Sequence, residues 1–435
     1  MNGLGYLAGL LLTAKWLIRW STGWRPSRWD DNQKSQTASR VLFVNRGLAV
    51  LTILLLAYCA IHAINARAIF WSAESQFEYL TCISWLPHSY NRPATWGYFC
   101  NYTALALFFW AGRDWVLTKS KDERKFEITG EFLPERLRRL LWLLCLNGGL
   151  LALEGIIQRF TTNKLLWLAE PTVNKTPESQ FGPYAYRSNG AQLLNLIWPV
   201  AVGFWWVLRC EVRKWRERHS THHLLLGCAL LMILAVILSL SRGALITAIV
   251  CIILISLVLL ASAEGNRWKA KLGLGLLLAS APLLVGGPWA YRFDSAGQDL
   301  DLNRVAMWKK AWNLVADYPW CGTGPGTFSS VYQLAPGATP QDWYGQLHND
   351  WLETLITWGG VGLAMILLTL TLCLSRWFFG SGIPTHRVLF LSFCIATAGC
   401  LLHAFADFPL QIYSILFLFI LLCSFLSCIA RASSK

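Results

Sequence analysis

His348 and Asn349 stand where the longest polar stretch of the chain meets an apolar segment. A titratable side chain at the mouth of a membrane helix is costly to place, so it is a candidate for function. A histidine with its ordinary pKa of about 6.5 is neutral at pH 7 and can take a proton from an acceptor hydroxyl. The competing interpretation is an interfacial histidine whose hydrogen bonds are merely satisfied. The neighbouring Asn349, and several arginines on the same side of the membrane, favour a catalytic His348.

Three arginines, Arg187, Arg242 and Arg304, come from separate parts of the sequence but fall on the same side of the membrane as His348. Arginine suits a diphosphate because its guanidinium is always charged, is planar and can donate two parallel hydrogen bonds. The alternative is that these side chains reach out to phospholipid head groups. For Arg187 taken alone we favour that alternative. Arg242 lies in the four-residue link 240–243 between two apolar segments, which favours a binding site.

Acidic residues offer supporting roles near the same side of the membrane. Glu353 follows His348 by about one helical turn, while Glu154 and Asp407 lie near the outer ends of their apolar segments. Each is able to orient a base or to bind a sugar hydroxyl, and each is equally able to be paired inside the helical bundle. Asp407, Glu353 and Asn349 are therefore predicted to support His348.

The pair Asp299-x-Asp301 is similar to the metal-binding aspartates of many glycosyltransferases. Paired acids are common in polar loops, and this pair lies on the outer side, where no nucleotide sugar is available. We therefore expect a solvated loop and no metal.

Long apolar segments must position all of these residues. Apolar residues make up 55% of the 435 residues and charged residues only 14%, unlike the balance of a soluble domain. Runs of about 20 apolar residues, each long enough to cross a bilayer as a helix, recur along the chain. The predicted fold class is an all-α integral membrane protein, a polytopic bundle of about 11–12 transmembrane helices. The predicted spans are 4–20, 41–64, 96–117, 140–158, 190–208, 223–240, 244–262, 271–289, 350–375, 388–405 and 409–430.

The distribution of Lys and Arg predicts the orientation of the bundle. The loops after the first, third, fifth, seventh and ninth spans, and the C-terminal residues, carry most of the basic side chains. The positive-inside rule makes this side cytoplasmic, so His348 is expected on the periplasmic side. The first apolar segment has no basic residue before it and is expected to be an anchor with its N-terminus outside. The net charge of +14 is attributed to topology and to anionic lipid, with no nucleic acid as partner.

The largest outer loop, 290–348, has internal structure of its own. Val305, Trp308, Trp312 and Val315 recur at helical spacing, which predicts an amphipathic helix over 303–316 at the membrane surface. The glycine-rich run 322–326 lacks the Lys and Ser/Thr of a P-loop, so we interpret it as a structural turn. Glycines 359 and 362 are expected to let a neighbouring helix approach closely.

We expect a single membrane domain, 1–435, that divides into three parts. These are N-terminal spans 1–189, a core 190–375 that includes the loop 290–348, and C-terminal spans 376–435.

Together the motifs resemble the bacterial O-antigen ligase and O-antigen polymerase superfamily. The resemblance covers about 190–375, and Asp407-Phe408-Pro409 extends it. It rests on Ser241-Arg242-Gly243 between two spans, on Arg304-x3-Trp308 and Pro319-x2-Gly322-x-Gly324-x-Gly326-x-Phe328 in the outer loop, and on His348-Asn349-x9-Gly359-x2-Gly362.

The resemblance implies a glycosyltransferase of the bacterial inner membrane with its active face toward the periplasm. Such proteins pass a glycan from an undecaprenyl-diphosphate carrier to an acceptor, without a nucleotide sugar, cofactor or metal. By matching position, Arg242 and Arg304 would hold the diphosphate and His348 would be catalytic. The arginines would neutralise the charge that develops on the leaving diphosphate. With His348 as general base, a single displacement would invert the anomeric carbon.

Several functions remain open at this point. Ligation of O-antigen to a lipid A–core acceptor is narrowly favoured over polymerisation of repeat units and over protein O-glycosylation, and membrane lipids are the remaining partners. A solute transporter would need polar or broken helices at mid-membrane, whereas the ionisable residues here gather near the outer rim. A structural membrane protein would need neither His348 nor the arginines.

Overall fold

The computed structural model describes residues 2–29, 35–125, 133–161, 179–215, 221–262, 300–336, 345–379 and 383–431. These residues form an all-α polytopic membrane protein with very little sheet. The helices of eight or more residues are α1 (Asn2–Thr22), α2 (Ser35–Ile64), α3 (Arg92–Leu117), α5 (Glu135–Phe160), α6 (Arg187–Trp215), α7 (His223–Leu238), α8 (Arg242–Ala261), α11 (Leu300–Asp317), α13 (Asp350–Phe379), α14 (Arg387–His403) and α15 (Tyr413–Leu426).

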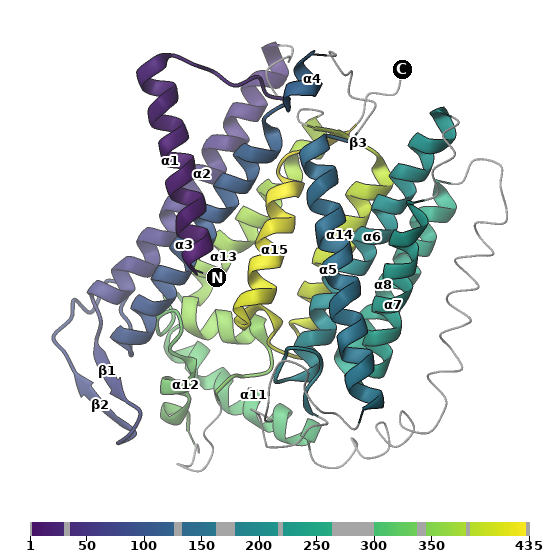
Figure 1. The fold of residues 1–435 in the computed structure, drawn as a ribbon. Coiled ribbons are helices and arrows are strands. Elements are labelled where there is room, and N and C mark those ends of the chain that lie inside the picture. The colour runs from purple at the N-terminus through teal and green to yellow at the C-terminus, as the bar shows by residue number, and fades with distance from the viewer. Residues whose placement is uncertain are drawn as a thin grey trace.

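The remaining elements are short and lie at the two ends of the bundle (Figure 1). One end carries the antiparallel hairpin of β1 (Ala68–Trp71) and β2 (Gln76–Tyr79), together with α11 and α12 (Phe328–Val331). The other end carries α4 (Lys121–Lys125) and the parallel pair β3 (Ile383–Thr385) and β4 (Ile429–Arg431). We call the first of these the loop end.

A helix is found at each predicted span except 271–289, which lies outside the described residues. Five of the described helices are long and apolar enough to cross a membrane: α2, α5, α6, α8 and α13. Helices α7, α14 and α15 are apolar but shorter. The predicted class of multi-pass α-helical membrane protein is confirmed.

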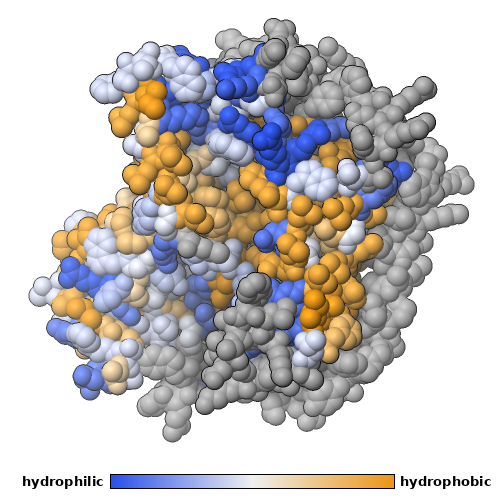
Figure 2. Space-filling view, viewed as in Figure 1, coloured by the Kyte–Doolittle hydropathy of each residue, from blue (hydrophilic) through white to orange (hydrophobic). Residues whose placement is uncertain are grey.

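The outer surface of the bundle is apolar in the middle of its height. Figure 2 shows apolar side chains gathered across the central band, with hydrophilic residues more frequent toward both ends. Leu10 of α1, Ile53 of α2 and Leu150 of α5 each expose about two thirds of their surface. A band of large exposed apolar side chains is favourable where hydrocarbon covers it, which is the condition inside a bilayer.

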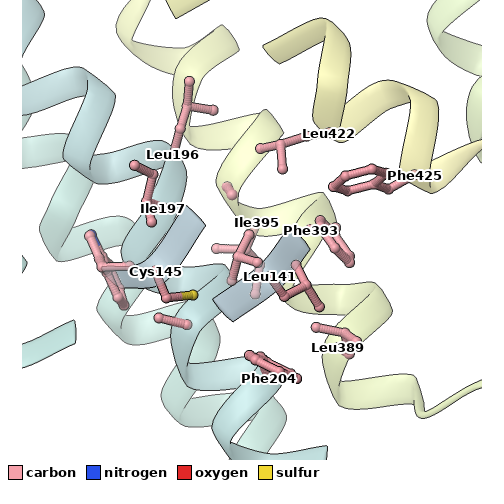
Figure 3. Close-up of a cluster of buried hydrophobic side chains, with 14 of the residues drawn as sticks. Leu141, Cys145, Leu196, Ile197, Phe204, Leu389, Phe393, Ile395, Leu422 and Phe425 are labelled. Carbon is pink, nitrogen blue, oxygen red and sulfur yellow. The ribbon is translucent and has the colours of Figure 1, made fainter. Parts of the chain in front are cut away.

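Helix α6 is the centre of the bundle. Its most apolar stretch is buried along its whole length, and α5, α7, α8 and α14 pack around it. Figure 3 shows the contact, with Leu141 of α5, Phe204 of α6 and Phe393 of α14 among the side chains that meet. A Cβ atom added at Gly203 would lie 2.3 Å from Ser392 Oγ, so α6 and α14 approach as closely as they do because residue 203 is glycine.

The predicted amphipathic helix is present as α11, although the buried face differs from the predicted one. Met307, Ala311 and Leu314 are buried at the loop end. Of the predicted apolar stripe, Trp308 and Val315 pack partly against this cluster, whereas Val305 and Trp312 are about half exposed. The helix therefore has apolar residues on more than one side, a feature that the spacing of four residues did not capture.

Helix α13 is broken at Gly359, about one third of the way along its length. The backbone there has φ +65° and ψ −178°, a conformation essentially restricted to glycine. A Cβ at Gly359 would lie 2.3 Å from the carbonyl oxygen of Trp320. The space that Gly359 leaves is therefore filled by the backbone of the outer loop. The prediction for Gly359 was wrong in this respect, because it expected a neighbouring helix.

The glycine-rich loop satisfies the backbone groups that the break sets free. The amides of Thr323 and Gly324 donate to the carbonyls of Ile356 and Thr357, both at 2.9 Å. In the other direction, the amides of Gly360 and Val361 donate to the carbonyls of Pro319 and Trp320, at 2.8 and 3.1 Å.

The hydroxyl of Tyr58 on α2 completes this arrangement by donating to the Trp358 carbonyl at 2.8 Å. Irregular backbone at membrane depth is tolerated when protein groups satisfy it in this way. Glycines 322, 324 and 326 have φ between +71° and +106°, so the loop is the structural turn that the sequence predicts.

Candidate active site

His348 lies at the loop end, directly before α13, in a backbone conformation that is rare for residues other than glycine. Its φ is +54°, and its side chain is 27% exposed. The preceding Leu347 is held from both sides: Trp308 Nε1 donates to its carbonyl at 2.9 Å, and its amide donates to Glu353 Oε2 at 3.0 Å. A strained conformation at a side chain that contacts other polar groups is typical of functional sites.

Asn349 and Glu353 shape the segment rather than contact the imidazole. Asn349 caps α13, because its Oδ1 accepts the amide of Leu352 at 3.0 Å. Glu353 is buried and reaches back to Leu347 from the first turn of α13. Among the described residues, both side chains thus bond to backbone amides on either side of His348.

Asp407 contacts the imidazole of His348 directly. His348 Nδ1 and Asp407 Oδ1 are 3.0 Å apart, and Asp407 is 5% exposed. An ionised carboxylate only accepts hydrogen bonds, so Nδ1 must be the donor. In the neutral ring, Nε2 then carries the lone pair that is able to take a proton. The segment between α14 and α15 thus fixes the tautomer of His348.

Two further side chains stabilise the charged form of Asp407. Ser188 Oγ donates a short hydrogen bond to Oδ2, and His403 Nε2 lies 3.7 Å from the same oxygen. Burial raises the pKa of Asp407, but the hydrogen bond from His348, the nearby His403 and the Ser188 hydroxyl outweigh it, so the pKa lies below its ordinary value. Asp407 is therefore a carboxylate throughout the physiological range.

His403 is a residue that the sequence analysis missed. It is buried at the end of α14, with Nδ1 2.7 Å from Gln192 Oε1 and Nε2 3.2 Å from Ser188 Oγ. A Cβ at Gly243 would meet the imidazole at 2.7 Å, so the glycine of the Ser-Arg-Gly link makes room for this ring. A signal was present in the sequence, since His403 precedes Asp407 by four residues at the end of an apolar segment.

A chain of hydroxyl groups joins the Ser-Arg-Gly link to Asp407. Ser241 Oγ donates to Ser188 Oγ at 3.1 Å, and Ser188 donates to Asp407. Ser241 is also the N-cap of α8, where its Oγ accepts the amide of Ala244 at 3.4 Å. The predicted tight hairpin of α7 and α8 is confirmed, with Arg242 as the first residue of α8. Arg187 and Arg242 therefore each adjoin a serine of this network.

Arg304 reaches the same cluster from α11. Its Nη1 donates to the Ala406 carbonyl at 3.2 Å, and its Nη2 lies 3.5 Å from the Tyr186 hydroxyl. Ala406 directly precedes Asp407, and Tyr186 directly precedes Arg187. The guanidinium thus bridges two segments that also carry other residues of the site.

Two aromatic rings complete the surroundings of His348. Phe408 meets the imidazole edge to face, with ring centroids 4.7 Å apart. Tyr186 stacks on Phe408 at 5.5 Å and lies edge-on to His348 at 6.1 Å. The imidazole of His348 therefore has two aromatic neighbours and the Asp407 carboxylate at Nδ1, and its side chain is partly exposed.

The other acids that the sequence singles out are Glu154, Asp299 and Asp301. Glu154 is buried in α5. Asp299 lies outside the described residues, as does the side chain of Asp301. Within the described ranges, no group of three His, Cys, Asp or Glu residues is arranged to hold a metal ion.

One family model is similar to the middle part of the chain. Residues 227–367 match the family model Wzy_C, described as "O-Antigen ligase". The matched stretch contains Arg242, Arg304 and His348, while Asp407 lies beyond it. No curated protein matches the chain.

The match supports the O-antigen ligase and polymerase superfamily, so the resemblance predicted from the sequence is confirmed. The family supports a glycosyl-transferring enzyme that acts on lipid-linked glycans.

Proposed function

Starting from this superfamily, we propose that the protein transfers a glycan from an undecaprenyl-diphosphate carrier to an acceptor hydroxyl at the periplasmic face of the inner membrane. Ligation of O-antigen to lipid A–core is the favoured form of this reaction. The observation that carries the proposal is the contact of His348 Nδ1 with Asp407 Oδ1 at 3.0 Å, beside Arg304.

His348 is the general base in this proposal. Asp407 accepts a hydrogen bond from Nδ1–H, so Nε2 is the nitrogen that takes the proton of the acceptor hydroxyl while the oxygen attacks the anomeric carbon. The bond between that carbon and the diphosphate breaks, and the diphosphate leaves with the electron pair. Because the acceptor enters opposite the leaving group, the configuration at the anomeric carbon inverts. A positioned base of this kind typically contributes about 10²–10⁴-fold to the rate.

The arginines hold and neutralise the diphosphate. Arg304 contacts the backbone next to Asp407, and Arg242 and Arg187 each adjoin a serine of the hydroxyl chain that ends on Asp407. Fixed guanidinium groups stabilise negative charge that develops on a leaving group without reorganising during the reaction. The reaction needs no nucleotide sugar and, in this proposal, no metal or cofactor.

A transporter is the second candidate, and the broken helix α13 is the observation that favours it. Discontinuous helices form the substrate sites of many transporters because their free backbone groups bind the solute. In this protein five of the groups around Gly359 bond to Tyr58 and to the loop 319–324 instead. The break is thus filled by the chain itself, which supports the enzyme over the transporter.

The experiment compares surface glycans in a strain that lacks the gene and carries either the wild-type sequence or His348→Ala. The lipid-linked pool is analysed in parallel. Loss of all glycan on lipid A–core, with long chains accumulating on the carrier, supports ligation. Core capped by a single repeat unit supports polymerisation by the same histidine, and an effect confined to glycoproteins supports protein O-glycosylation.

His223→Ala is the matched control, because His223 is exposed at the start of α7, away from the cluster. Both variants are checked for equal amounts in the membrane. A normal glycan ladder with His348→Ala would contradict the proposed role of this residue and, with it, the mechanism.

A further inference from the structure

A cavity lies between α2, α3, α13 and α15. Its volume is about 240 Å³, and neither His348, Asp407 nor Arg304 lines it. The wall contributed by α13 runs from Asp350 to Cys373. At about 1.5 Å per residue, this wall is about 35 Å long, which is similar to the thickness of the hydrocarbon layer.

Most of the cavity wall is apolar. Leu55 of α2, Phe109 of α3, Leu363 of α13 and Phe419 of α15 are among the lining residues. An apolar wall of this kind fits an alkyl chain, which gains van der Waals contacts along it. Since the cavity follows helices of the membrane bundle, the molecules that reach it most readily are lipids.

One end of the cavity is acidic. Asp350 is 2% exposed, and its Oδ2 accepts the amide of Leu410 at 2.8 Å. Its Oδ1 accepts no well-formed hydrogen bond among the described residues, and the side chain of Gln411 lies beside the carboxyl group. Glu353 lines the same end about one helical turn further along. A buried carboxyl oxygen without a partner is costly, and a hydrogen-bond donor in the cavity would remove that cost.

The height of Asp350 indicates which part of a lipid would meet it. Asp350 is the first residue of the α13 span, so it lies at the level of the lipid head groups, whereas Phe419 and Cys373 lie deeper. A phosphate beside two carboxyl groups would be repelled, while a cationic donor would be attracted. The site is therefore complementary to an ammonium group with a chain directed along the helices.

We propose that this cavity binds a membrane lipid whose head group ends in a primary ammonium. The ammonium donates to Asp350 Oδ1, and an acyl chain lies against Leu363 and Phe419. This site is additional to the proposed donor site, because the acidic end disfavours a diphosphate. Its occupation does not depend on the transfer reaction.

Binding is measured by native mass spectrometry on the full chain, purified in detergent and stripped of lipid. The probes are phosphatidylethanolamine, phosphatidylcholine and phosphatidylglycerol with identical acyl chains, and undecaprenyl phosphate. Phosphatidylethanolamine alone carries N–H donors on its head group, so we expect it to bind about tenfold more tightly than the other three. Equal or tighter binding of phosphatidylglycerol or of undecaprenyl phosphate would overturn the proposal.

Two variants test the acidic end and the apolar wall of the cavity separately. Asp350→Asn is expected to remove the preference for phosphatidylethanolamine, whereas Asp317→Asn, at an exposed aspartate of α11, keeps it. Leu363→Trp fills the apolar part without changing any charge and is expected to weaken binding of phosphatidylethanolamine. This variant keeps the proposal testable if Asp350→Asn fails to fold. A preference that persists in both cavity variants would refute the site.

Discussion

His348 Nδ1 is hydrogen-bonded to Asp407 Oδ1 at 3.0 Å, although 59 residues separate the two in the chain. The bond joins the end of the outer loop to the short segment between α14 and α15. It orients the imidazole and fixes its tautomer, so that one nitrogen is committed to the protein and the other is left for a substrate.

Asp407→Asn is expected to lower kcat by about 10²–10⁴-fold with a smaller change in KM, because an amide does not secure the Nδ1–H tautomer. The change is measured with purified protein, a lipid-linked donor and an acceptor. Asp317→Asn serves as the control. A loss seen only in KM would contradict the role of Asp407 in orienting the base.

The pKa of Asp407 lies below its ordinary value, since its partners outweigh its burial. A lowered pKa means that the carboxylate stabilises the fold above the ordinary value of about 3.9 and that this contribution is lost only as the pH falls further. The stability that the wild type gains over Asp407→Asn is therefore expected to be kept down to about pH 5 and to shrink only as the pH falls through the ordinary value. Thermal midpoints of both proteins between about pH 3 and pH 6 measure it, and a loss that is already complete at about pH 5 would refute the assignment.

Ser188→Ala is expected to lower kcat by about tenfold, because it removes a hydrogen bond of about 1.5 kcal/mol or more to a charged group. Ser188 is the one residue that links Asp407, His403 and Ser241 within the described network. Ser188→Thr keeps the hydroxyl and should restore part of the activity. If Thr and Ala behave alike in kcat while both fold normally, Ser188 has only a packing role.

Two variants, Arg304→Lys and Arg304→Gln, distinguish the contribution of the charge of Arg304 from that of its planar pair of donors. Lys keeps the charge but not the planar pair of donors, so we expect a loss in kcat/KM of about tenfold for Lys and about 10²-fold or more for Gln. The assay is the same transfer reaction, with donor concentration varied. Exposed Lys309 on α11 provides the matched control Lys309→Gln. Equal activity of Gln and wild type would exclude Arg304 from the diphosphate site.

Gly359→Ala is expected to destabilise the protein by about 1–3 kcal/mol, because the backbone conformation is strained for any other residue. The added methyl group would also collide with the Trp320 carbonyl. Thermal unfolding in detergent measures the effect. Gly227→Ala in α7 is the control, since nothing lies within 4 Å of a Cβ there. An unchanged unfolding temperature for Gly359→Ala would show that the break is not required.

The sequence predicted the elements well because apolar length is a direct consequence of the bilayer. The spans, the tight link at Arg242 and the helix α11 all follow from local composition and spacing. Asp407 was singled out as an acid near His348, and the structure shows the contact itself. The position of Asp407 between two apolar segments was enough to predict that it lies near the site.

The partners of Asp407 were not predictable in the same way. Ser188, Gln192 and His403 are ordinary polar residues in their own segments, and only the packing of α6 against α14 brings them together. The same holds for Gly359, whose role depends on a loop about 35 residues earlier. Long-range contacts of this kind leave no periodic pattern in a single sequence.

The residues that bond around the break in α13 are synthesised before the break itself, whereas the partner of His348 is synthesised after His348. The residues whose backbone or hydroxyl groups bond around the break are all synthesised before Gly359. They are Tyr58, Pro319, Trp320, Thr323 and Gly324. All of these partners are therefore already part of the chain when α13 is synthesised. His348, by contrast, must wait for α14 and the segment that carries Asp407. A nascent chain arrested before that segment would hold the broken helix but not the completed base.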